Sequence, residues 1–312
     1  MKKSLLQMHI AVLLWGFTGV LGKVISLSAP VLVWYRMGLT ALFIAIIIHY
    51  RKLWQKILKP DLKKLILIGL LFSIHWVMFY SAIKLANASI ALICLSTSSV
   101  FTAVIEPLST GKRINPREIG LSLIAIFGVY LIYALKDEHT IGQMVNFPLG
   151  LLLGLIASVL SAVFTVLNKP LTRKYEPRLL VFYEMMIGFI FLTIVAPFYI
   201  SNNPGEPLLM QGWDIVWILC LVYFCTVLGQ ILAMNALKNL SSFTVTFMVN
   251  LEPLYGILLA FLLLNEHKEA NLGFYLGVSV IGFSVLLQSF IIVRQSKKNK
   301  KLIAAKAKLT EG

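Results

Sequence analysis

The chain has 312 residues, of which 59% are hydrophobic and only 13% charged, and its mean hydropathy is +0.86. A soluble globular domain carries roughly a quarter charged residues, so this composition excludes an ordinary soluble protein. The net charge of +15 would in a soluble protein point to nucleic acid, but the basic residues stand in short segments between long apolar runs, so no nucleic-acid partner is expected.

Apolar runs long enough to cross a bilayer recur along the chain. A helix rises about 1.5 Å per residue and the hydrocarbon core is about 30 Å thick, so each crossing needs about 20 residues. The runs lack the alternation of barrel strands. We therefore predict an all-α polytopic membrane protein with ten transmembrane helices, the fourth of which should end at Glu106 and Pro107. In chain order the expected spans are residues 5–25, 31–50, 63–83, 86–108, 117–135, 148–168, 178–199, 213–236, 241–264 and 271–293.

The basic residues divide unequally between the two sides of these spans. With the N-terminus in the cytoplasm, the inner segments hold 23 of the 28 lysines and arginines and the outer segments hold four. Because short loops rich in Lys and Arg stay in the cytoplasm, we predict a multi-pass protein of the cell membrane with both termini inside. The basic tail of residues 294–312 should then contact anionic lipid of the bilayer.

The two halves of the chain resemble one another. A shift of 154 residues aligns Ala82-Ile83-Lys84 with Ala236-Leu237-Lys238 and Gly128 with Gly282. The halves, residues 5–135 and 148–293, each hold five predicted helices. Because five is odd, equivalent helices cross the membrane in opposite directions, which is the inverted repeat of many secondary transporters, with the substrate site near the midplane.

These features resemble the EamA domain of the drug/metabolite transporter superfamily. The resemblance covers residues 5 to 293, and its motifs are Trp15-Gly16, Arg36, Leu264-Asn265-Glu266 with Leu272-Gly273, and the glycines Gly277 to Gly282. The chain departs from the family where Thr110-Gly111-Lys112 replaces the usual acidic residue. The resemblance implies transport of a metabolite but not which one.

Glu252 is the principal candidate for a functional side chain. It stands near the middle of span 241–264, roughly 17 Å from either membrane face. Pro253 should kink the helix, because it removes the hydrogen bond to the carbonyl of Val249, and Asn250 adds a polar group. A carboxylate beside freed carbonyls could bind an amine or a cation, or carry a proton. The alternative is a protonated acid that only fixes helix packing.

The repeat places other polar groups at matching depths. Ser98, within Ser96–Ser99, matches Glu252 and could line the same cavity, or its hydroxyl could serve helix packing. Upstream, where the alignment has one inserted residue after Pro30 and Pro177, Trp34-Tyr35-Arg36 matches Phe182-Tyr183-Glu184. Arg36 and Glu184 thus match one another, each about 9 Å inside but from opposite faces, so they should not pair. Arg36 could attract an anion near the outer mouth, or its side chain could extend to the interface. Glu184 could attract a cation near the inner mouth.

Three further side chains could take part in transport or only in packing. His75 lies midway along the third predicted helix and could shuttle protons, although a lone histidine is more often a packed, hydrogen-bonded group. Gln230 matches Trp76 in the repeat, and Trp15 could stack on a substrate ring. Cys94, Cys220 and Cys225 stand singly without metal-ligand spacing, so the sequence predicts neither a metal site nor a cofactor.

The sequence therefore predicts a secondary transporter of a small metabolite, such as an amino acid or an amine. We expect an exporter that works by alternating access and couples to protons, because no glycine-rich phosphate loop points to ATP. The alternatives are an intramembrane lipid-modifying enzyme and a membrane scaffold that does not transport. The ionisable residues are dispersed rather than gathered at one interface, which favours the transporter over the enzyme. The oligomeric state does not follow from the sequence.

Overall fold

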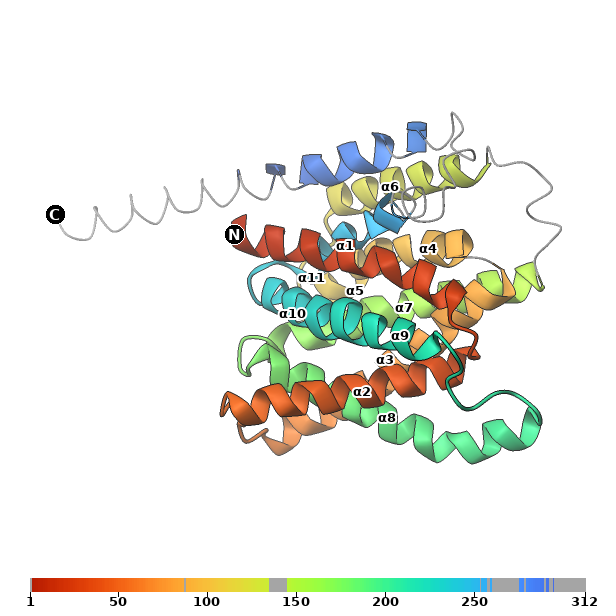
Figure 1. Cartoon of the computed structure of the whole chain (residues 1–312). Coiled ribbons are helices and arrows are strands. Elements are labelled where there is room, and N and C mark those ends of the chain that lie inside the picture. Colours follow the sequence, from red (N-terminus) through yellow and green to blue (C-terminus); the bar gives the residue numbers. More distant parts are fainter. Residues whose placement is uncertain are drawn as a thin grey trace.

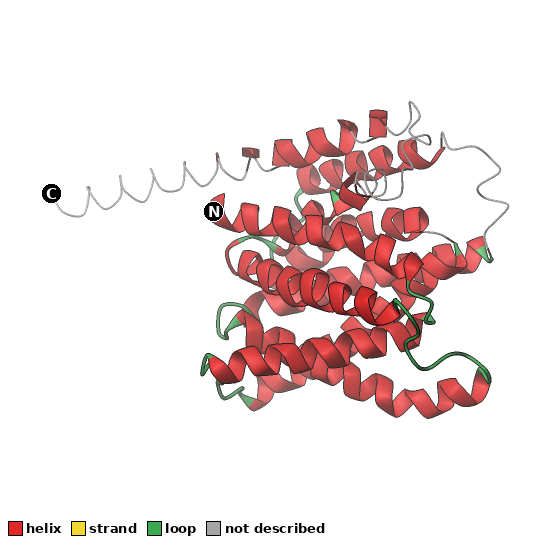
Figure 2. Cartoon of the chain, in the orientation of Figure 1, coloured by secondary structure: helices red, strands yellow, loops and turns green. Residues whose placement is uncertain are grey.

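The computed structural model is a bundle of helices that run roughly along one common direction (Figure 1). The part of the chain that the structure describes contains helices and connections but no strand (Figure 2). It comprises residues 2–86, 88–134, 145–252, 254–256, 259, 275–277, 279–288, 290–291 and 294. The helices are α1 (Lys2–Val24), α2 (Ala29–Tyr50), α3 (Lys59–Leu85), α4 (Ala88–Ser96), α5 (Ser98–Thr110), α6 (Pro116–Ala134), α7 (Phe147–Leu171), α8 (Pro177–Asn202), α9 (Asp214–Cys220), a π-helix (Leu221–Leu228), α10 (Gly229–Asn239) and α11 (Ser242–Val249).

Local sequence explains where these helices begin and end. Proline occupies the first turn of α2, α3, α7 and α8, where its missing N–H costs nothing. The Asn146 side chain caps α7 by accepting the backbone N–H of Leu149 at 3.1 Å. Gly111, with φ of 67°, ends α5 in the left-handed conformation that glycine adopts without strain.

Several helices are long and apolar enough to cross a membrane. Seven such segments are found among the described residues, which also contain a shorter apolar helix, Tyr275–Gln288. The prediction of an all-helical membrane protein is therefore confirmed. The count of ten crossings stays a prediction, because residues 260–274 of the last two expected spans lie outside the described residues. The seven are Lys2–Val24, Ala29–Tyr50, Lys59–Leu85, Ile90–Thr110, Phe147–Leu171, Pro177–Asn202 and Asp214–Asn239.

Three of the expected spans are not single regular helices. The fourth is broken at Thr97 into α4 and α5, and α5 continues through Pro107 to Thr110, so the expectation that it ends at Glu106 and Pro107 was wrong. The eighth contains the π-helix between α9 and α10. The ninth breaks at Asn250 and Leu251 before the helix resumes at Glu252. The shift of 154 pairs Thr97 with Leu251, so the two breaks fall at matching positions of the repeat.

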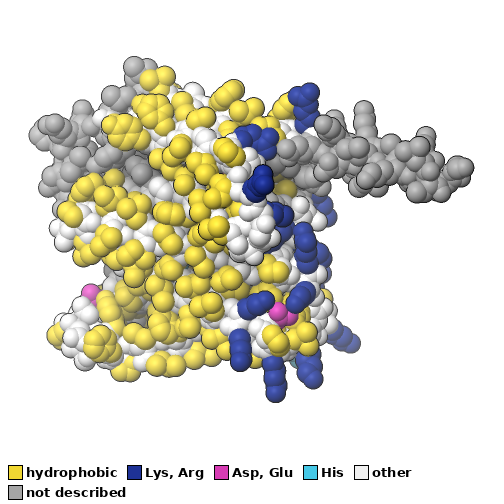
Figure 3. Space-filling view, turned by 180° about the vertical axis from the view of Figure 1, so that it is seen from behind, with side chains coloured by type: hydrophobic (Ala, Val, Ile, Leu, Met, Phe, Trp, Pro, Cys, Tyr) yellow, Lys and Arg dark blue, Asp and Glu magenta, His cyan; other side chains and the backbone are white. Residues whose placement is uncertain are grey.

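Charge distinguishes the two ends of the bundle. Lys and Arg side chains gather at one end of the face in Figure 3, and hydrophobic side chains cover most of the remainder of that face. The N-terminus and the connection between α7 and α8 lie at this basic end (Figure 1). There Lys174, in that connection, pairs with Asp61 in the first turn of α3 at 3.1 Å.

Helix α3 forms the centre of the bundle. It packs extensively against both α7 and α8, and so joins the first half of the chain to the second. Small residues permit the close approach: a Cβ at Gly69 of α3 would meet Ile187 of α8 at 2.8 Å, and one at Gly154 of α7 would meet Cys94 of α4 at the same distance. Small residues at such contacts are characteristic of membrane helices.

Candidate substrate cavity

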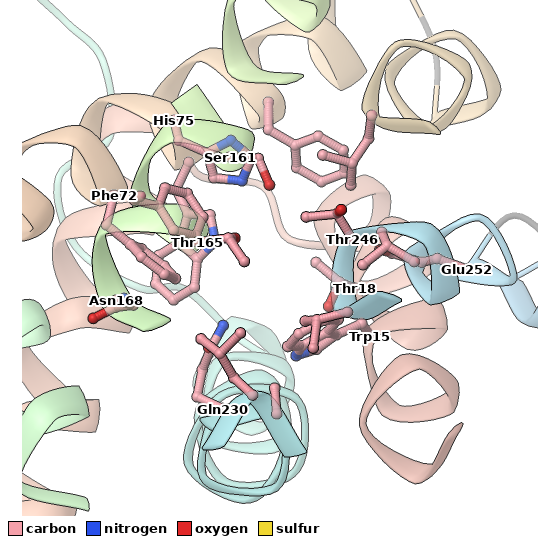
Figure 4. A pocket seen from close by; sticks show the side chains of 18 of the residues that line it. Trp15, Thr18, Phe72, His75, Ser161, Thr165, Asn168, Gln230, Thr246 and Glu252 are labelled. Carbon is pink, nitrogen blue, oxygen red and sulfur yellow. The ribbon is translucent and has the colours of Figure 1, made fainter. Parts of the chain in front are cut away.

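A cavity of about 90 Å³ lies among the central helices (Figure 4). Its wall combines aromatic and aliphatic side chains with a few polar groups, one guanidinium and one carboxylate. The lining residues are Trp15, Thr18, Arg36, Phe72, His75, Trp76, Phe79, Leu95, Ser161, Phe164, Thr165, Asn168, Gln230, Ala233, Met234, Leu237, Val245, Thr246, Val249 and Glu252.

A second hollow, of about 550 Å³, lies between α2, α3 and α8 and is lined almost entirely by apolar and aromatic residues. No charged side chain lines it. A solute site in a membrane protein needs polar groups that replace water around the solute. The smaller cavity is therefore the candidate site.

The smaller cavity extends from the middle of the bundle toward the basic end. On α7 its wall reaches Asn168, next to Lys169, and on α10 it reaches Leu237, next to Lys238. At the opposite end, contacts join the halves. Asp214, at the start of α9, accepts hydrogen bonds from the backbone N–H of Ser26, at 3.0 Å, and from the Ser26 hydroxyl. At the end opposite the basic one, these contacts hold the two halves together and close the bundle. The cavity thus lies between this closed end and the basic end.

Arg36 lies deeper than its sequence position indicated. It is 2% exposed, so the side chain does not extend to the membrane interface. Its Nε donates to the Thr226 hydroxyl at 2.8 Å and its Nη1 to the Tyr80 hydroxyl at 2.7 Å. The guanidinium carbon stands 3.7 Å from the centre of the Trp76 ring, a cation–π contact. A fixed cation thus faces the cavity, and its expected attraction for an anion stays a prediction.

Glu252 lies in the same wall and is 4% exposed. No hydrogen bond among the described residues uses its carboxylate, and the charge of Arg36 acts on it. The helix break at Asn250 and Leu251 comes immediately before it. Pro253, which we expected to kink this helix, lies outside the described residues.

Three other predicted residues also line the cavity. His75 has its Nδ1 at 2.7 Å from the carbonyl oxygen of Ala157; because a carbonyl only accepts, Nδ1 carries the hydrogen and Nε2 is left as an acceptor when the ring is neutral. The indole N–H of Trp15 is buried without a partner. Gln230 projects into the opening from α10 (Figure 4).

The remaining predicted residues are buried outside the cavity wall. Asn250 donates to the Ser99 hydroxyl at 3.5 Å, so the two helix breaks touch. The Ser98 hydroxyl and both carboxyl oxygens of Glu184 are buried and have no hydrogen-bond partner in the part of the chain that the structure describes. Arg36 and Glu184 do not pair, as expected: the ion pairs of the described residues are Lys174–Asp61 and Arg178–Glu176.

The sequence analysis missed a polar stripe on α7. Ser161, Thr165 and Asn168 all line the cavity, and their spacing of four and three residues places them on one helix face. This spacing was visible in the sequence and was the available signal. Thr18 and Thr246 were missed as well, because a single threonine in an apolar helix usually bonds its own backbone.

Metal chemistry finds no support among the described residues, where no three His, Cys, Asp or Glu side chains lie close enough to hold an ion.

Comparisons with known proteins agree with this architecture. A solved crystal structure covers 95% of this chain and 99% of its own, with a TM-score of 0.74 and 14% identity, which shows a shared fold. An uncharacterized transporter of Archaeoglobus fulgidus is 30% identical over 190 residues, 61% of this chain and 63% of its own length. One of Clostridium kluyveri is 27% identical over 248 residues, 78% of this chain and 75% of its own. A probable biotin transporter of Pseudomonas aeruginosa is 24% identical over 222 residues, 69% of this chain and 74% of its own.

The family model of the EamA-like transporters matches twice, over residues 2–134 and again over residues 148–289. Together the two matches span most of the chain. This multi-pass membrane protein is therefore a transporter that belongs to the EamA-like transporter family of the drug/metabolite transporter superfamily.

Proposed function

We propose that this transporter carries a small zwitterion with an apolar side chain, such as L-leucine, across the cell membrane by alternating access. The observation that carries the proposal is one cavity with Arg36 and Glu252 in its wall. The guanidinium would bind the carboxylate of an amino acid and the Glu252 carboxylate its ammonium group. The apolar side chain would lie against aromatic residues such as Phe72 and Phe164.

The volume of the cavity limits the size of the substrate. At about 90 Å³, the cavity is several times larger than the roughly 10–15 Å³ that a single water molecule requires, so it suits a small solute such as an aliphatic amino acid. Biotin, after which one relative is named, is much larger, and we expect no biotin transport by this chain.

The direction we propose is export. With the basic end in the cytoplasm, as the distribution of lysine and arginine favours, the cavity extends toward the side on which an exporter loads. Protons are the proposed coupling ion, since the buried carboxyl groups of Glu252 and Glu184 offer places to carry them.

The test uses the purified protein in liposomes and three related probes. They are radiolabelled L-leucine, 3-methylbutylamine, which lacks the carboxylate, and 4-methylpentanoate, which lacks the ammonium group. L-Leucine should show counterflow, and each analogue should compete at least about tenfold more weakly, because one charged hydrogen-bonded contact is lost.

Two variants identify the binding groups. Arg36→Gln should weaken L-leucine binding about tenfold or more and leave competition by the amine unchanged. Glu252→Gln should also weaken L-leucine binding about tenfold or more, but should leave competition by the acid unchanged. Glu118→Gln, which changes a half-buried carboxyl of α6 outside the cavity wall, is the matched control. The proposal fails if the native protein exchanges no aliphatic amino acid. It also fails if the amine and the acid compete equally well in Arg36→Gln and in Glu252→Gln.

A further inference from the structure

A second buried acid lies beside the cavity but not in its wall. Glu184 is on α8, which packs against α2 and α3, and its side chain is 0% exposed. Neither carboxyl oxygen has a hydrogen-bond partner among the described residues. A carboxylate in that position would be fully buried with no hydrogen bond from the described residues, so the neutral acid is the form that this conformation supports.

The polar neighbour of this carboxyl group is Asn168 of α7. Both polar atoms of the Asn168 side chain are likewise buried without a hydrogen-bond partner. Asn168 stands at the edge of the cavity, one turn beyond Thr165, with its amide turned away from the centre of the opening (Figure 4). It is therefore the group that stands between the cavity and Glu184.

The repeat explains why Glu184 lacks partners. Its counterpart in the first half, Arg36, bonds Tyr80 and Thr226. The shift of 154 residues that relates the halves pairs Tyr80 with Met234 and Thr226 with Phe72. The positions equivalent to the two hydroxyl groups thus hold a thioether, Met234, and a phenyl ring, Phe72.

Among the described residues, no charged side chain forms an ion pair with Glu184. Four titratable groups of the helices packed on α8 are bonded elsewhere: Arg36 of α2 to Thr226 and Tyr80, and on α3 Asp61 to Lys174, His75 to the carbonyl of Ala157, and Lys84 to the carbonyl of Ile25. The other lysines and the other histidine of these helices are exposed at the surface: His49 of α2, Lys59, Lys63 and Lys64 of α3, and Lys238 of α10. Lys169 of α7, next to Asn168 in the chain, donates to the carbonyls of Leu237 and Leu240 at the end of α10.

We propose that Glu184 and Asn168 form a proton-binding site that couples transport to a pH gradient, separate from the substrate site at Arg36 and Glu252. This inference rests on the proposed function and assigns its coupling step to one group. A proton passes between cavity water and the Glu184 carboxyl group past the Asn168 amide. Ionisation leaves a buried carboxylate beside the Asn168 amide alone, and so favours another conformation in which water reaches it. The proton returns to water there, and no other reactant is needed.

Infrared difference spectra test the site without any substrate. For the full chain in liposomes, a step from acidic to alkaline pH should give carbonyl bands of protonated carboxyl groups. Glu184→Gln should remove one of them, and Glu252→Gln should leave that band in place. Asn168→Leu, which keeps the acid, should shift the frequency of the Glu184 band. Identical bands in the native protein and Glu184→Gln would overturn the proposal.

Transport measurements then test the coupling. In liposomes that contain the native protein, an imposed pH gradient should drive accumulation of L-leucine. Glu184→Gln should reduce this accumulation about tenfold or more, while counterflow of L-leucine without a gradient is far less affected. Glu252→Gln should weaken counterflow itself about tenfold or more. An undiminished gradient response in Glu184→Gln would refute the coupling role. If the native protein does not exchange L-leucine, the substrate proposal fails, and the infrared bands still decide the proton site.

Discussion

Glu106 stabilises the start of a helix from the other half of the protein. Its carboxylate accepts the backbone N–H groups of Ser242 at 3.0 Å and of Phe243 at 2.8 Å. The first N–H groups of a helix have no partner within it, and an anion there also interacts favourably with the helix dipole. The hydroxyl of Ser241 accepts the N–H of Thr244 at 3.1 Å, so side chains supply all three contacts at the start of α11.

Replacing Glu106 should therefore destabilise the protein, by an amount that depends on the new side chain. Glu106→Gln keeps an acceptor and should cost about 1 kcal/mol. Glu106→Ala leaves two N–H groups unpaired and should cost roughly 2–4 kcal/mol. Thermal melts in detergent should show the same order, with the control Glu118→Ala near the native midpoint. Equal midpoints for Glu106→Ala and the native protein would contradict the capping role.

Counting residues from the membrane face predicts where a Cα atom lies, but not where a long side chain ends. Glu252, which counting places near the middle of its span, lines the cavity. Arg36 also lines the cavity, and its side chain is buried rather than extended to the interface. Trp76, Tyr80 and Thr226 determine where the guanidinium lies, and they come from helices distant in sequence.

Irregular helix segments surround the cavity. The breaks at Thr97 and Leu251 lie at matching positions, and the π-helix Leu221–Leu228 comes directly before Gly229 and Gln230. Single π-helical turns within α-helices occur frequently at functional sites. Leu221–Leu228 contains no glycine or proline that would have marked the irregularity, so composition alone could not have predicted it.

Gly229, at the end of the π-helix, leaves room for the Trp15 ring. A Cβ at Gly229 would lie 2.7 Å from the indole nitrogen of Trp15, too close for any real contact. Gly229→Ala should push the Trp15 ring into the cavity. It should weaken L-leucine counterflow about tenfold, because a methyl-sized change in a binding pocket typically has an effect of this order.

Gly120→Ala is the matched control for this substitution. It also lies within a helix, but a Cβ there would meet nothing within 4 Å. Alanine should leave transport unchanged and stabilise α6 by up to about 1 kcal/mol. Equal counterflow in the two variants would show that the Trp15 ring does not limit the space for substrate.

At the scale of the whole molecule, one end is closed where the cavity does not reach. Ser26 follows α1 in the first half, and Asp214 begins α9 in the second, so their hydrogen bonds join the two halves. Beside them, the Lys84 ammonium group donates to the carbonyl of Ile25 at 2.8 Å. Alternating access requires these contacts to separate when the other side opens.

A disulfide at this place should therefore stop transport. Hydrogen-bonded side chains bring their Cβ atoms close to the separation that a disulfide needs. In a chain whose three native cysteines are replaced by alanine, oxidised Ser26→Cys with Asp214→Cys should lose L-leucine counterflow, and a reductant should restore it. Each single variant is a control for oxidation. Full transport by the completely cross-linked protein would exclude opening at this end.

The overall architecture followed from the sequence further than the site did. Apolar run length and the family resemblance predicted an all-helical membrane transporter, since the bilayer constrains every span alike. The polar stripe of Ser161, Thr165 and Asn168 could have been found by its spacing, but which helix faces the cavity depends on packing across the whole bundle. Glu184 was named for its depth, while its lack of partners could only come from the structure.

The contact of Glu106 with α11 also bears on how the chain is made. Glu106 is synthesised well before Ser242 and Phe243, so the anion that α11 needs is already present when that helix leaves the ribosome. Helix α11 of the second half can then form against Glu106, which belongs to the part of the chain made earlier. A second half produced by itself lacks this anion, so the two halves are not interchangeable at this helix.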